Sequence, residues 1–185
     1  MNTKFKIYKL TTLELNNLVY KDPIKCKSHY EVPIMYKEQD TGVTTPLFIQ
    51  LPNLYIKDFN ENNDLLFLLT NASYNLIKSF DDKIINDLKI ILQTLRKFHA
   101  NKQIKYEYNS LILENDSSSL GTSASSYILK IKTNSKMNNL KIFDDDNKFV
   151  DINIKECIGL NARSIVQVSS VIVQDNQIYL NMKLH

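Results

Sequence analysis

The sequence predicts a β-rich α+β domain with one prominent amphipathic helix. Most apolar segments are short and alternate with polar residues, as half-buried strands do. One segment, 81–102, instead places its apolar residues at helical spacing. The 185 residues are 43% hydrophobic and 23% charged, with three glycines and four prolines, a composition that supports one sizeable core and argues against a disordered chain. We therefore expect a single domain over 1–185.

The first half of the chain contains the expected strands around two prolines. Leu47, Ile49 and Leu51 alternate with polar or outward positions in 44-TTPLFIQLPNLYIK-57, between Pro46 and Pro52. Proline lacks the ladder N–H and restricts the residue before it, so we expect a strand over 47–51 that ends at each proline. Further strands are expected at 5–10, 30–37 and 65–71, with a loop at 57–64, whereas 11–20 is ambiguous between strand and helix.

The expected helix covers 81–102. Its acidic start, Asp81 and Asp82, suits the electropositive end of a helix, and Arg96, Lys97 and Lys102 suit the opposite end. The apolar residues between them share one face: Ile84, Ile85, Leu88, Ile91, Leu92, Leu95 and Phe98.

The second half returns to strand patterns. Strands are expected at 104–113 and 126–133, on either side of the Ser-rich segment 114–126, which we expect to be a mobile surface loop. Later strand patterns are 140–143, 148–154, 163–173 and 178–185, the last two joined by a tight turn at 175–177.

Motifs for catalysis and for metal or cofactor binding are missing from the sequence. His29, His99 and His185 are scattered, and no Walker loop, GxSxG or HExxH motif occurs. Cys26 and Cys157 have no CxxC or histidine spacing around them, which suggests two free thiols and no zinc site. The acidic run 144–146 is explained better by a turn than by a metal site. We expect no enzymatic activity and no cofactor.

The charge pattern favours phosphate contacts. The formal charge is +3, and Arg96 and Arg163 are the only arginines, so lysine point charges dominate. The sequence shows neither the apolar core of a signal peptide nor a run long enough to span a membrane, so we expect an intracellular, soluble protein.

Aromatic and basic residues interleave along several expected strands. Bases stack on aromatic faces while lysines follow the phosphates, which is the pattern of a single-stranded nucleic-acid surface. The alternative from pattern alone is that the tyrosines belong to the core and the lysines to the solvated face. The candidate binding residues are Tyr55, Lys57, Lys105, Tyr106, Tyr108, Tyr127, Lys130 and Lys132.

The order of four segments resembles a known family. PLFIQLP, the helix after Asp81, 127-YILKIK-132 and the closing 163-RSIVQVSSVIVQDNQIYLNMKLH-185 occur in the order found in the OB-fold single-stranded DNA-binding proteins of large nucleocytoplasmic DNA viruses, including the asfarvirus type. The resemblance covers most of the chain. It implies an OB-like, partly open antiparallel barrel that binds oligonucleotides across one sheet face.

The functional expectation is single-stranded DNA binding with little sequence preference, during viral replication, repair or recombination. RNA as a ligand, replication proteins as partners, and the oligomeric state remain open, and the resemblance places the protein in the host cytoplasm, a viral factory or the virion. The rival hypothesis is a structural or protein-interaction module, such as a virion component or a replication-factor adaptor, that docks a partner through the 81–102 helix or an exposed sheet edge. An enzyme is the most distant alternative.

Overall fold

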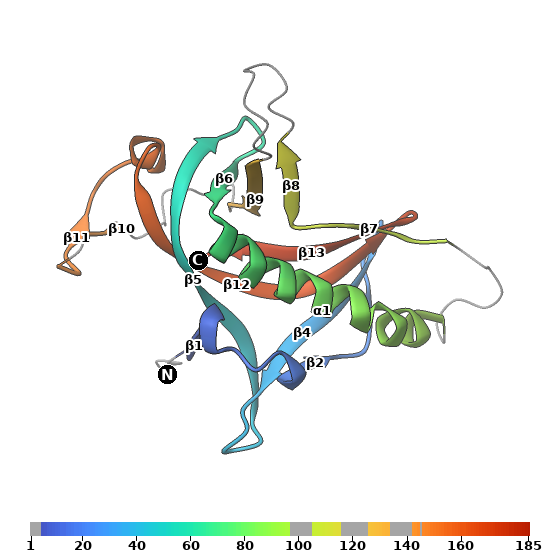
Figure 1. Cartoon of the computed structure of the whole chain (residues 1–185). Coiled ribbons are helices and arrows are strands. Elements are labelled where there is room, and N and C mark those ends of the chain that lie inside the picture. The colour runs from blue at the N-terminus through green and yellow to red at the C-terminus, as the bar shows by residue number, and fades with distance from the viewer. Residues whose placement is uncertain (1–4, 97–104, 116–125, 134–141, 145) are drawn as a thin grey trace.

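The computed structural model describes residues 5–96, 105–115, 126–133, 142–144 and 146–185 (Figure 1). Strands dominate these residues, and the α-helix among them is α1 (Asn71–Arg96). The prediction of a β-rich α+β fold with one prominent helix is confirmed. The strands are β1 (Ile7–Lys9), β2 (Leu18–Tyr20), β3 (Ile24–Lys25), β4 (Tyr30–Lys37), β5 (Thr44–Phe59), β6 (Asp64–Leu69), β7 (Glu107–Asn109), β8 (Ile112–Asn115), β9 (Ser126–Lys132), β10 (Ile142–Phe143), β11 (Phe149–Val150), β12 (Asn161–Gln174) and β13 (Gln177–Leu184).

Five strands form a closed circuit of hydrogen-bonded pairs. β5 pairs with β6, β6 with β9, β9 with β13, β13 with β12, and β12 again with β5. The β9–β13 pair is parallel and the other four are antiparallel. Inside the circuit lie side chains that are at most 1% exposed, among them Leu47, Ile49, Phe67, Leu129 and Val168. The closing contact between β9 and β13 is one residue pair, Lys132 with Lys183, and β7 pairs with the opposite end of β13.

The long strand β5 corrects the prediction for 47–51. β5 runs through both prolines, and Pro46 pairs opposite Met35 of β4. Asn53 faces Arg163 and Gln50 faces Ile165, so β5 carries one extra residue here, and Pro52 lies in this bulge. A bulge tolerates proline because the ladder is already interrupted there. The prolines therefore do not end the strand, and β5 passes from β4 through β12 to β6.

Helix α1 begins ten residues earlier than predicted. Thr70 caps it: its Oγ1 accepts from the Ser73 backbone N–H at 3.3 Å, and the Ser73 hydroxyl oxygen accepts from the Thr70 N–H at 2.8 Å. Such reciprocal bonds satisfy donors that a helix start leaves unpaired. Asp81, predicted at the first turn, instead lies buried within the helix at 3% exposure. The predicted helical residues 97–102 lie outside the described residues.

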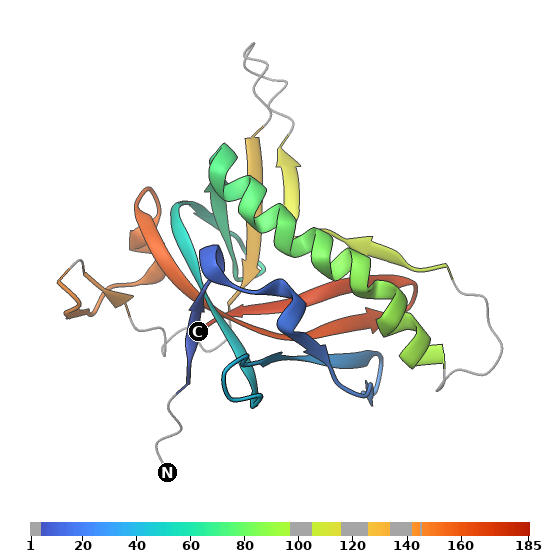
Figure 2. The ribbon, with the colours of Figure 1, turned by 60° about the horizontal axis from the view of Figure 1, so that its bottom comes forward.

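The apolar face of α1 packs on the sheet. Ile84 and Ile91 are 0% exposed and Leu95 is 2% exposed, and they belong to the same core as the strand residues. Figure 2 shows the helix lying across the strands over most of its length. The helix was one of the two docking elements of the protein-interaction hypothesis. Ile84, Ile91 and Leu95 are buried and unavailable for docking, whereas Ile85, predicted on the same face, is 40% exposed.

Several predicted segments differ locally from the structure. β5 and β6 extend into the expected loop 57–64, and of the expected strand 148–154 only β11 forms. The expected strand 104–113 is divided into β7, which begins at Glu107, and β8, with Ser110 and Leu111 between them. The expected loop 114–126 overlaps β8 and β9 at its two ends, and 116–125 lie outside the described residues. The C-terminal hairpin is confirmed, because β12 and β13 pair from Val166–Leu184 to Gln174–Gln177 around a turn in which Asp175 has a φ of 51°.

Candidate nucleic-acid interface

One side of the β5–β6–β9 sheet carries most of the predicted binding residues that reach solvent. The register aligns Tyr55 of β5 with Leu68 of β6, Ile128 of β9 and Leu113 of β8, so these four side chains share one side of the sheet. Lys130 and Lys132 follow Ile128 at two-residue steps and lie on the same side. We call this side, defined by Tyr55, Leu68, Ile128, Lys130 and Lys132, the lysine face.

Helix α1 lies on the opposite side. Tyr127, next to Ile128 in β9, points away from the lysine face and stacks on Tyr74 of α1, with ring centroids 4.0 Å apart. The lysine face is therefore the side of β6 and β9 that α1 does not cover. Within it, Tyr55 and Leu113 are 41% and 42% exposed and form the two ends of an apolar row.

The lysines of this face make no ion pair with the carboxylates of the described residues. Lys132 is aligned with Lys183 of the parallel strand β13, and both point away from the core. Lys57, Lys130, Lys132 and Lys183 make no ion pair within the part of the chain that the structure describes. Asp64 is aligned with Lys132, but its carboxylate accepts from the Asn60 side-chain amide at 3.3 Å. Neighbouring like charges repel, and a bound anion would relieve that repulsion.

Tyr179 adds an aromatic ring to the lysine cluster. The Lys132 ammonium lies 5.4 Å from the centroid of the Tyr179 ring, a cation–π distance. The Tyr179 hydroxyl donates to Gln174 Oε1 at 3.0 Å, which orients the ring. Burial and the carboxylates of Glu31 and Asp175 raise the pKa of Tyr179, so it stays neutral at physiological pH. Sequence reasoning missed Tyr179 and Lys183 because their alignment with β9 requires the parallel β9–β13 pair, which links strands about 50 residues apart.

Three predicted stacking residues lie elsewhere. Tyr108 points toward α1 and donates to Asp81 Oδ1 at 2.6 Å; burial and the Asp81 carboxylate raise its pKa. Tyr106 is partly buried against the core. Tyr127 is held by Tyr74, and the neighbouring Tyr74 ring, followed by burial, raises its pKa. The structure therefore does not bring Tyr106, Tyr108 and Tyr127 together with Tyr55 on one face.

The remaining predicted lysines are exposed. Lys57 occupies the irregularity of β5 between Ile56 and Asp58, beside the lysine face. Lys105 precedes β7, which pairs with the far end of β13 from Lys183. Lys57 is thus close to Tyr55 in the chain, whereas Lys105 belongs to a different part of the sheet.

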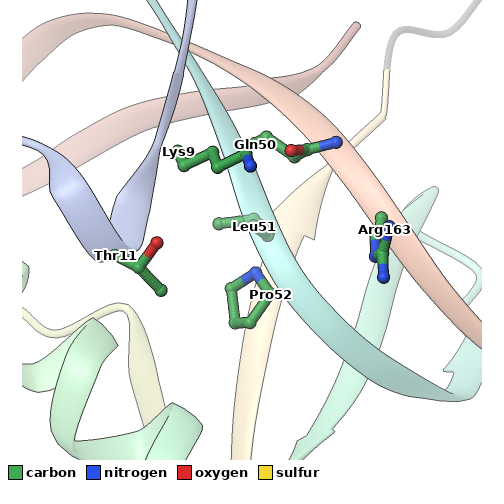
Figure 3. A pocket seen from close by; sticks show the side chains of 6 residues that line it. All are labelled: Lys9, Thr11, Gln50, Leu51, Pro52 and Arg163. Carbon is green, nitrogen blue, oxygen red and sulfur yellow. The ribbon is translucent and has the colours of Figure 1, made fainter.

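A second basic site lies along β5. A cavity of about 210 Å³ is lined by six residues from β1, the short 3-10 helix Leu10–Thr12, β5 and β12; among the described residues, two cations and no carboxylate line it. Lys9 of β1 is aligned with Gln50 of β5, and Arg163 of β12 is aligned with Asn53 of β5, so the two cations belong to the strands on either side of β5. Figure 3 shows Lys9 and Thr11 on one side of β5 and Arg163 on the other. Arg163 and Asn161 are two residues apart on β12, and Asn161 faces Tyr55, so Arg163 lies on the same side as Tyr55. The lining residues are Lys9, Thr11, Gln50, Leu51, Pro52 and Arg163.

Two sequence interpretations about metal ligands can be compared with the structure. At the 144–146 run, Asp144 Oδ1 accepts from the backbone N–H groups of Asp146 and Lys148 at 3.0 and 2.8 Å, as expected for a turn. The sequence interpretation found no metal-ligand spacing around Cys26, whereas in the structure Cys26, His29 and Glu31 meet in space on the β3–β4 hairpin.

Comparisons with known proteins leave the family open: no protein-family model and no curated protein matches this sequence. Among the described residues, no helix combines the length and the apolar character needed to cross a membrane.

Proposed function

We propose that this protein binds single-stranded DNA with little sequence preference through the lysine face. The observation that carries the proposal is the lysine cluster Lys130, Lys132 and Lys183, which makes no ion pair among the described residues, on a surface that also carries the exposed ring of Tyr55 and the partly exposed ring of Tyr179. Lysines neutralise phosphates and aromatic rings stack on bases whatever the sequence, so this combination suits non-specific single-strand binding.

The strand circuit supports an OB-type arrangement for this proposal. OB-folds are five-stranded Greek-key barrels that bind oligonucleotides on strands 2 and 3, between the loop joining strands 1 and 2 and the loop joining strands 4 and 5. Counting from β5, strands 2 and 3 of the circuit are β6 and β9, and the two loops are 60–63 and 175–176. The lysine face lies on β6 and β9, with Tyr179 close to the second loop. In this protein α1, β7 and β8 are inserted between strands 2 and 3.

The chemistry of the face favours backbone contacts over base reading. Sequence-specific recognition relies mainly on bidentate contacts to base edges, for which arginine and amide side chains are suited. The lysine face offers ammonium groups, which act as point charges toward phosphate. The cavity at Lys9 and Arg163 extends the basic surface along β5 and suits one further phosphate.

Fluorescence anisotropy with labelled oligonucleotides of equal length tests the proposal. Single-stranded DNA, duplex DNA and single-stranded RNA are compared at one low salt concentration, with homopolymeric and mixed single strands as the sequence control. We expect tighter binding to single strands than to duplex and similar affinity for different sequences. Binding to no single strand at micromolar protein, or tighter binding to duplex, would overturn the proposal.

A protein-interaction module is the second candidate, and the β10–β11 hairpin favours it. Phe143 and Phe149 face each other across this hairpin and are 55% and 59% exposed, with ring centroids 6.2 Å apart. Exposed paired aromatics are common at protein interfaces. If single strands do not bind, and Phe143→Ser with Phe149→Ser abolishes concentration-dependent self-association in sedimentation velocity, this second candidate is favoured.

A further inference from the structure

The β3–β4 hairpin gathers three potential metal ligands. One ligand atom each of Cys26, His29 and Glu31 lies within 4.8 Å of the other two. These are a thiol, an imidazole and a carboxylate, and all three residues are partly buried.

The hairpin register explains why the three side chains meet. Ile24 pairs with Glu31 and Lys25 with Tyr30, and the Cys26 N–H donates to the His29 carbonyl at 2.9 Å, so Cys26 stands opposite His29. Residues two apart on a strand share a face, which places Glu31 on the side of His29. Lys25 is adjacent to Cys26 in the strand and points to the other side. Residues 27–28 form the turn.

The local hydrogen bonds suit a metal on the histidine Nε2. This atom lies 3.0 Å from Glu31 Oε1, and the other ring nitrogen, Nδ1, lies 3.4 Å from the Ser28 hydroxyl oxygen. Metal-bound histidines commonly donate their second ring N–H to an oxygen, which sets the tautomer and the ring orientation. Ser28 can accept that bond and leave the Nε2 lone pair for a cation.

The distances between the three ligand atoms and their combined charge also fit a zinc ion. Zinc binds sulfur and nitrogen at about 2.0–2.3 Å, so tetrahedral ligands lie roughly 3.3–3.8 Å apart. The His29 Nε2 and Glu31 Oε1 atoms are already 3.0 Å apart, and a ligand pair at the 4.8 Å limit needs to contract by only about 1 Å. A thiolate and a carboxylate together neutralise a divalent cation. Thiolate and imidazole ligands select zinc over magnesium or calcium, which prefer oxygen.

We propose that Cys26, His29 and Glu31 form a Zn²⁺ site with an open fourth position. β3 has only two residues, and the metal would fasten it to β4 at the periphery of the sheet. The site shares no residue with the lysine face, although Glu31 and Tyr179 are both aligned with Ile172, and the proposal does not depend on nucleic-acid binding.

Cobalt and zinc titration of the reduced, metal-free full chain tests this site. Co²⁺ bound through a cysteine gives a thiolate-to-metal charge-transfer band in the near ultraviolet, and Zn²⁺ should abolish it at one equivalent. Zinc affinity is then measured by competition with a chromophoric chelator. We expect Cys26→Ser to remove the band, and His29→Gln and Glu31→Gln each to weaken zinc binding by at least about tenfold.

Cys157→Ser and His185→Gln are the matched controls, because they alter the other cysteine and a distant histidine; both should leave zinc binding unchanged. Circular dichroism of the three site variants checks that they fold, as expected for substitutions on a peripheral hairpin. The proposal is overturned if no charge-transfer band forms, if the band survives Cys26→Ser, or if His29→Gln and Glu31→Gln both bind zinc as tightly as the unaltered protein.

Discussion

The contact between Tyr108 and Asp81 makes a specific prediction about stability. Asp81 is 3% exposed, and its carboxylate accepts from the Tyr108 hydroxyl at 2.6 Å, the Ser110 hydroxyl at 2.5 Å and the Leu111 N–H at 3.5 Å. No cation forms an ion pair with it among the described residues. In Tyr108→Phe, the Oδ1 atom of Asp81 keeps, among the described residues, only the 3.5 Å hydrogen bond from the Leu111 N–H.

The expected loss in the free energy of unfolding follows from the charge of the acceptor, the Asp81 carboxylate. A hydrogen bond to a charged group contributes about 1.5–3 kcal/mol, and an acceptor left buried without its partner loses comparable free energy. Tyr108→Phe should therefore lower the free energy of unfolding by about 1.5–3 kcal/mol, measured by urea denaturation with linear extrapolation. Single-strand binding should be unchanged once the protein is folded, because the Tyr108 ring faces α1.

Tyr55→Phe is the matched control. It removes the same atom from an exposed tyrosine and should change the free energy of unfolding by less than about 0.5 kcal/mol. A Tyr108→Phe protein as stable as the unaltered chain would refute the role of this contact. A loss of DNA binding at unchanged stability would show instead that Tyr108 faces the ligand.

Three further predictions concern pH and binding. Burial and a hydrogen-bonded carboxylate raise the pKa values of Tyr108 and Tyr20, so the folded state holds these protons more tightly than the unfolded chain. The stability that these two groups contribute should be full below about pH 10 and fall as the pH rises above it. Denaturation at several alkaline pH values should show a shallower fall in stability for the Tyr20→Phe, Tyr108→Phe double variant than for the unaltered protein. Tyr55→Ala should weaken single-strand binding in anisotropy titrations by about 1–3 kcal/mol, and an unchanged affinity would exclude stacking at this ring. Lys9→Ala with Arg163→Ala should weaken binding at low salt and make it less salt-dependent, whereas unchanged titrations would show that the cavity on β5 takes no phosphate.

Local patterns in the sequence predicted several elements well. The alternation in 30-YEVPIMYK-37 corresponds to all of β4, and the Asp-Asn turn at 175–176 marks the β12–β13 hairpin. The acidic pair Asp81 and Asp82 predicts a helix start there, whereas the helix begins after Thr70, where Thr70 and Ser73 each accept the other's backbone N–H. Asp81 was misassigned because its hydroxyl partners, Tyr108 and Ser110, are nearly 30 residues away.

The candidate sites depended still more on tertiary pairing. The alternation of Lys130 and Lys132 could be read locally, but the alignment of Lys132 with Lys183 and Tyr179 requires the parallel β9–β13 pair. The meeting of Cys26 with His29 follows from a two-residue turn at 27–28, which no glycine, proline or asparagine marks in the sequence. The two-residue periodicity of a strand shows which side chains share a face of the sheet. It does not show which of the two faces another element packs against.

The salt dependence of single-strand binding tests the central claim most directly. Each phosphate neutralised on a single strand contributes about −0.7 to the slope of log Kobs against log salt concentration. The unaltered protein should show a steep negative slope, and Lys130→Ala with Lys132→Ala should reduce its magnitude by about 1.4. Lys37→Ala with Lys89→Ala removes two exposed charges away from the lysine face and should leave the slope as it was. A flat slope for the unaltered protein, or the same slope in the Lys130 and Lys132 double variant, would contradict a phosphate-binding lysine face.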